Sequence, residues 1–134
     1  MPTEPISPGV NDPGTAIDII STFVRLFSIW INFKNDSQES EAKFDKVRFC
    51  TLSVKDMFDD AFTAIERDGS SLIEVTIKLI KSLSALSSIG DEQVQQAAAY
   101  HAKRIIKYAE QKLVLESDIN NVRDEAQIIF SVKP

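Results

Sequence analysis

The sequence is poor in the residues that form disulfides, metal sites and phosphate-binding loops. Among its 134 residues there are one cysteine, four glycines and one histidine. A lone Cys50 forms no internal disulfide, and no Cys/His spacing typical of zinc is present, so we predict no metal site. The glycines form no G-x-G or G-K-S/T motif, so no cofactor is predicted. The unpaired cysteine indicates a reducing compartment.

Positive charge is also in short supply. Fifteen Lys and Arg residues stand against twenty Asp and Glu residues, which gives a net charge of −5. Phosphate backbones attract proteins through an excess of basic residues. We therefore predict no nucleic-acid partner.

What the sequence does contain is typical of a folded soluble protein. Hydrophobic residues make up 43% and charged residues 26% of the chain, a length that suits one compact domain. We predict a single helical domain over residues 1–134, soluble as this chain. A proline-rich connector occupies residues 1–14, and the helical core occupies residues 15–134.

Apolar residues recur at helical spacing through most of the chain, so the predicted fold class is mainly α. We expect an antiparallel bundle of about five helices with one short β element. Asp12, Ser53 and Asp91 are the expected N-caps of three of these helices. Gly69 and Gly90 are the expected stops of the second and third. The five helices are expected at 13–33, 53–69, 70 or 71–90, 91–115 and from 117 or 118 onward; a loop is expected at 35–45 and a short strand at 46–50.

The first predicted helix is apolar around most of its circumference. Ala16 to Phe33 is about as long as the shortest membrane span, but it carries Asp18 and Arg25. We therefore interpret it as a buried helix of a soluble domain. A domain of this size cannot bury all of its apolar surface, so part of this helix is expected to form an interface. The predicted partner is a second copy, giving a dimer, and the predicted interface residues are Phe23, Trp30 and Phe33.

No set of residues predicts catalysis, and no catalytic residue is assigned. Asp56, Asp59 and Asp60 share one helical face, yet acidic residues in a first helical turn are typical of a solvated face stabilised by the helix dipole. His101 lies at the edge of an apolar stripe, which favours a packed, hydrogen-bonded imidazole over a general base. No G-x-S-x-G motif is present.

The connector ahead of the first helix is dense in residues that fix backbone conformation. Asp12 and Thr15 can satisfy the start of the helix, and free N–H groups there favour a bound anion. A small-ligand-binding, metal-binding or enzymatic domain with its site around this loop is therefore an alternative hypothesis. Its predicted ligand-binding residues are Ser7, Asn11, Asp12 and Thr15.

The same connector carries a family resemblance. Ser7 to Ala16 resembles the signature S-P-G-[IV]-N-D-P-x-T-A of a bacterial family of predicted multi-pass membrane proteins of unknown function. A second stretch, from Asp56 to Gly69, is similar to that family's D-x-x-D-x-A-F-x-x-I-R-x-Y-G pattern, with Asp68 where the family has tyrosine. The membrane-spanning helices that precede the signature in family members are absent from this sequence.

The resemblance implies a C-terminal domain on the cytoplasmic face of the bacterial inner membrane, with no known reaction. The membrane-spanning part of the parent protein is then an implied partner. The leading hypothesis is an uncharacterised, non-enzymatic interaction or regulatory module. A cleft that joins the Asn11–Thr15 loop to the acidic face or to His101 would favour the enzymatic alternative.

Overall fold

Residues 12–39 and 53–131 are described by the structure, a computed structural model. Within these ranges the chain forms five helices and no strand. They are α2 (Pro13–Glu39), α3 (Val54–Gly69), α4 (Ile73–Ile89), α5 (Glu92–Lys112) and α6 (Glu116–Ser131). The mainly helical fold class is therefore confirmed. The strand predicted at 46–50 lies outside the described residues, and no described residue supports a β element.

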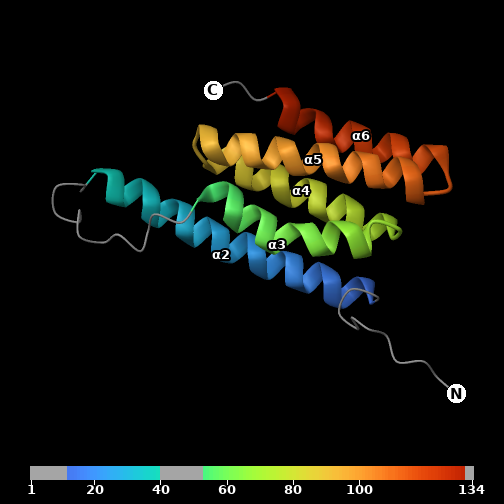
Figure 1. The fold of residues 1–134 in the computed structure, drawn as a ribbon, viewed down its shortest axis with the longest axis horizontal. Coiled ribbons are helices and arrows are strands. Elements are labelled where there is room, and N and C mark those ends of the chain that lie inside the picture. Colours follow the sequence, from blue (N-terminus) through green and yellow to red (C-terminus); the bar gives the residue numbers. More distant parts are fainter. Residues whose placement is uncertain (1–11, 40–52, 132–134) are drawn as a thin grey trace, which may run out of the picture.

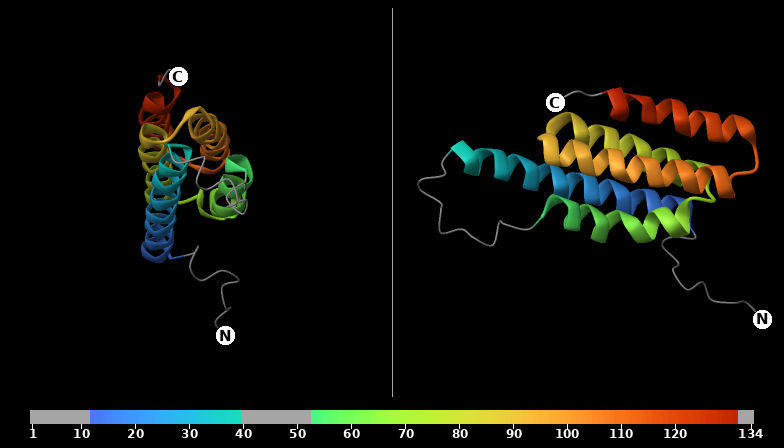
Figure 2. Two further views of the ribbon diagram at one scale, coloured as in Figure 1. Left: turned by 90° about the vertical axis from the view of Figure 1, so that its left-hand side faces the viewer. Right: turned by 45° about the horizontal axis from the view of Figure 1, so that its top comes forward.

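The helices form two layers, with α2, α4 and α6 in one and α3 and α5 in the other (Figures 1 and 2). Consecutive helices run in opposite directions along the long axis (Figure 1). In one layer α4 lies between α2 and α6, and in the other α5 lies beside α3. Each layer thus holds every second helix of the chain, so neighbours within a layer are parallel. α4 contacts each of the other four helices.

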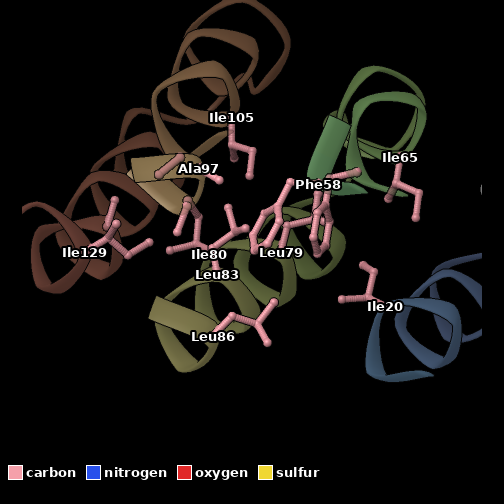
Figure 3. Close-up of a cluster of buried hydrophobic side chains, with 14 of the residues drawn as sticks. Ile20, Phe58, Ile65, Leu79, Ile80, Leu83, Leu86, Ala97, Ile105 and Ile129 are labelled. Carbon is pink, nitrogen blue, oxygen red and sulfur yellow. The ribbon is translucent and has the colours of Figure 1, made fainter. Parts of the chain in front are cut away.

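The core is one cluster to which all five helices contribute. α4 supplies its centre, with Leu79, Ile80 and Leu83 fully buried (Figure 3). Alanines on α5, among them Ala98 and Ala102, allow close helix approach because they have almost no side chain to hold the backbones apart.

The predicted caps are confirmed by their hydrogen bonds. The side chain of Ser53 accepts from the Asp56 N–H, and that of Asp91 accepts from the Val94 N–H. Asp12 accepts from the Gly14 N–H and the Thr15 hydroxyl at the start of α2. Each cap satisfies N–H groups that the first helical turn leaves unpaired.

Several predicted helix boundaries were wrong by a few residues. α2 continues to Glu39, through part of the expected 35–45 loop, because residues 34–39 contain no proline or glycine to stop it. α4 begins at Ile73, after a turn in which the Thr76 hydroxyl donates to the carbonyls of Ser70 and Leu72. α5 ends at Lys112 because the carbonyl of Leu115 accepts from N–H groups in the first turn of α6.

α2 is covered less than the sequence predicted. Between residues 13 and 33, where its side chains are described, only one stripe is buried, consisting of Ala16, Ile20, Phe27 and Ile31. Pro13–Phe33 is long and apolar enough to cross a membrane by length and composition, and 22% of its apolar window is buried inside the bundle. α2 stands at the edge of its layer, so only α4 and, to a smaller extent, α3 cover it.

Candidate functional site

An uncovered apolar surface on α2 lies beside its buried stripe. Leu26 is 57% exposed, and Ile29 and Phe33 are also exposed. Ile19, Phe23 and Trp30 are partly buried and pack at the edge of the core. The bundle therefore leaves a continuous apolar strip on one flank of this helix.

The strip has the spacing of a helix–helix seam. Ile19, Phe23, Leu26, Trp30 and Phe33 follow one another at alternating steps of four and three residues. This pattern places side chains along one line of a helix, where they insert between the side chains of a facing helix. We call these five residues the docking surface.

A groove between α2 and α3 widens the docking surface. Its volume is about 380 Å³, and its lining is apolar except for Asp60. The α2 wall consists of Phe23, Leu26 and Phe27, and the α3 wall consists of Met57, Asp60 and Ala61.

Aromatic rings hold the floor of this groove in place. Phe27 stacks on Phe62 with ring centroids 5.8 Å apart, and it lies 5.0 Å from Phe58. The rings of Phe23 and Phe62 meet edge-on, with their centroids 6.1 Å apart. Offset and edge-on ring pairs of this kind add to the stability of a buried contact. The groove is thus a preformed feature of the α2–α3 contact.

The interface residues predicted from sequence all lie on the docking surface. Phe23 and Trp30 are partly buried, whereas Phe33 is exposed. Sequence reasoning missed Leu26 as an exposed member of this surface. Leu26 could have been found from its place in the seam spacing. Whether the residues form an interface stays a prediction.

The predicted ligand loop is described only in part. Ser7 and Asn11 lie outside the described residues. Asp12 and Thr15 bind each other, with the Thr15 hydroxyl donating to an Asp12 carboxylate oxygen over 2.7 Å. Both side chains are thus engaged in starting α2. Ligand binding by this loop stays a prediction.

The three aspartates that the sequence places on one face of α3 point to different surroundings. Asp56 lies at the capped start of the helix and is exposed, Asp59 contacts His101, and Asp60 lines the groove. Among the described residues no group of three or more Asp, Glu, His or Cys side chains is arranged to hold a metal ion.

His101 is buried at the contact between α3 and α5 and is bound from both sides. Its Nδ1 contacts a carboxylate oxygen of Glu66, and its Nε2 lies 2.8 Å from an oxygen of Asp59. The packed, hydrogen-bonded histidine predicted from the sequence is confirmed. The full burial of Glu66 was not predicted, because the residue spacing of α3 alone does not show which helix faces it.

Two cations complete this network. The Arg104 Nε donates to the second oxygen of Glu66 over 2.8 Å, and Lys55 pairs with the second oxygen of Asp59 over 2.7 Å. The hydrogen bond from Lys55 lowers the pKa of the Asp59 carboxyl below its ordinary value, partial burial opposes that shift, and His101 adds to it. The hydrogen bond to Glu66 raises the pKa of Arg104. Both pKa shifts mean that the charged forms of Asp59 and Arg104 are favoured.

Comparison with protein-family models assigns the chain to a family. The model of a family described as "Predicted membrane protein (DUF2254)" matches residues 5–85, more than half of the sequence. The chain belongs to this family. No curated protein and no solved structure matched. The resemblance found in the sequence is thus confirmed at the level of a predicted membrane protein family.

The DUF2254 match covers particular parts of the fold. It includes α2, α3 and α4 as far as Ala85, so the docking surface and both walls of the groove lie inside it. Asp59 and Glu66 also lie inside the match, whereas His101 and Arg104 lie beyond it. The apolar α2 surface therefore lies within the part of the chain that matches this membrane protein family.

Proposed function

We propose that this chain is a non-enzymatic interaction module of a bacterial membrane protein, and that its docking surface packs against an apolar helix of the membrane-spanning part of that protein. One observation carries the proposal. The five residues of the docking surface have the spacing of a helix–helix seam, but the described helices cover them only in part and leave Leu26 and Phe33 exposed.

The spacing supports a helix as the occupant over a lipid surface or a small ligand. Lipid chains require only an apolar face, whereas alternating steps of four and three residues suit interdigitating side chains. The groove extends the same surface onto α3 with Met57 and Ala61, which gives a facing helix two walls to contact. The chain belongs to a family of predicted membrane proteins, and the membrane-spanning part of such a protein would contain the apolar helices that this docking requires.

The proposal places the module on the cytoplasmic face of the inner membrane. Support comes from the single cysteine, which is ordinary in a reducing compartment. A fluorescent protein that matures only in the cytoplasm, fused after Pro134, tests this placement. Fluorescence is expected, and its loss while an exported reporter is active would contradict the cytoplasmic placement.

Photo-cross-linking in the native membrane protein tests the docking. A photoreactive amino acid replaces Leu26 in one variant and Ile128 in a matched control. Ile128 is an apolar residue of α6 that is 59% exposed, nearly the same as Leu26 at 57%, but lies outside the docking surface. Mass spectrometry of the products identifies the partner peptide. We expect a cross-link from position 26 to a membrane-embedded helix and none to that helix from position 128.

Two results would contradict the membrane partner. Equal cross-linking at both positions would mean that exposure alone governs contact. A cross-link from position 26 to α2 of a second copy would assign the docking surface to the dimer expected from the sequence. Sedimentation equilibrium of the isolated chain then checks that dimer, because Trp30→Ser should dissociate it into 15.0 kDa monomers.

A further inference from the structure

The hydrogen bonds around His101 require more protons than a neutral histidine supplies. Neutral imidazole has one N–H and one bare nitrogen, and an ionised carboxylate only accepts hydrogen bonds. Each ring nitrogen of His101 faces a carboxylate oxygen, one of Glu66 and one of Asp59. With a neutral ring, one lone pair would point at a carboxylate oxygen with no hydrogen between them.

The surroundings indicate where the additional proton resides. Arg104 donates to the free oxygen of Glu66, and Lys55 donates to that of Asp59, so each carboxylate already has a cationic partner. Such partners favour the ionised form of a carboxyl group. The proton that completes the network therefore belongs to the ring, which becomes an imidazolium with two N–H donors.

We propose that Asp59, Glu66 and His101 form a buried proton-binding site, a proton lock, that fastens α3 to α5. The ligand is a single proton held on His101. Glu66 and His101 are almost completely buried, and Phe58, Phe62 and Tyr100 pack around the ring. A hydrogen bond between charged groups in such surroundings is strong when complete, and a missing hydrogen there is costly.

Losing the proton weakens the contact between the two helices. The charged and titratable groups that face His101 are Asp59, Glu66 and Lys55 on α3, and Tyr100 and Arg104 on α5. An ordinary histidine in an unfolded chain loses its proton near about pH 6.5. At higher pH the folded chain therefore holds one proton more than the unfolded chain, and its stability falls as the pH rises.

α3 also supplies one wall of the groove, which links the proton lock to docking. Met57, Asp60 and Ala61 lie on the same helix as the two lock carboxylates. If the proposed function holds, alkaline pH loosens this wall and weakens docking. The lock itself does not depend on the proposed function, because its proton is measured in the isolated chain.

Nitrogen NMR of the isolated chain measures the proton directly. His101 is the only histidine in the sequence, so its two ring nitrogens give one unambiguous pair of signals. At neutral pH we expect both nitrogens to have the chemical shifts of protonated N–H groups. A bare ring nitrogen at that pH would overturn the proposal, whatever the docking experiment shows.

Urea unfolding at several pH values tests the consequence. For the wild type, the unfolding constant should rise by up to about tenfold per pH unit above about pH 6.5, for as long as the folded chain keeps the proton. Glu66→Gln should remove this dependence. Its amide can donate to a bare Nδ1, so a neutral ring then satisfies both contacts.

Glu110→Gln is the matched control. Glu110 also pairs with an arginine, Arg123, at 2.8 Å, but its side chain is 43% exposed. This variant should keep the pH dependence of the wild type. An equal pH dependence in the wild type and Glu66→Gln would overturn the lock. If Glu66→Gln does not fold, the NMR measurement on the wild type still decides.

Discussion

At the scale of single residues, Asp59 and Glu66 lie about two helical turns apart on α3 and bind the same imidazole. Their environments differ, because Glu66 is fully buried whereas the Asp59 side chain is 30% exposed. A buried carboxylate depends on its partners, and removing one partner of a buried ion pair is strongly destabilising. Asp59 lies at the solvent edge, where water also reaches its carboxylate.

The lowered pKa of Asp59 predicts a loss of stability in acid. Its carboxylate favours the folded state above the ordinary pKa of an aspartate, and this contribution disappears as the pH falls through the lower folded-state pKa. Asp59→Asn should be less stable than the wild type near neutral pH and should lose less stability on acidification. Urea midpoints at acid and neutral pH measure both effects. An unchanged acid dependence in the variant would show that Asp59 does not carry it.

Part of this network follows from the sequence and part does not. The position of His101 on an apolar stripe was enough to predict a buried, hydrogen-bonded ring. The burial of Glu66 could not be predicted in the same way, because a glutamate in a helix is ordinarily solvated. Its partners come from α5, far along the chain, and local spacing contains no information about which helices meet.

At the scale of elements, close contacts decide where helices turn. Gly90 ends α4 with φ of −100°, a conformation that any residue adopts, so backbone freedom does not explain the glycine. A β-carbon added there would lie 2.4 Å from the Val94 side chain on α5. The sequence predicted Gly90 as a helix stop, but the structure shows that close packing is what requires glycine.

Gly90→Ala should destabilise the chain by about 1–3 kcal/mol, the range for forcing a methyl group into a packed site. Gly14→Ala is the control, because its added β-carbon would meet only the Asp12 side chain at 3.7 Å. The control should be as stable as the wild type or slightly more stable, since alanine favours helix. Thermal unfolding of both variants measures the difference. Equal melting temperatures would contradict the packing explanation.

At the scale of the whole molecule, the helical pattern was predictable and the layer arrangement was not. Apolar periodicity and caps identified all five helices, because both signals are local. Which helix stands at the edge depends on contacts between distant segments. The sequence therefore predicted α2 as a buried helix, although its neighbours α4 and α3 cover only one side.

The edge position of α2 has a consequence for the order in which the fold opens. α4, α5 and α6 are consecutive in the chain and contact one another pairwise, so they can remain assembled when α2 separates. Partial opening of this kind exposes backbone amides to solvent exchange at a lower free energy than global unfolding. In native-state hydrogen exchange, amides of α2 should exchange faster than those of α4; equal rates would mean that the five helices open together. A helix that detaches alone can exchange its contact with α4 for a new partner while the rest of the fold stays intact.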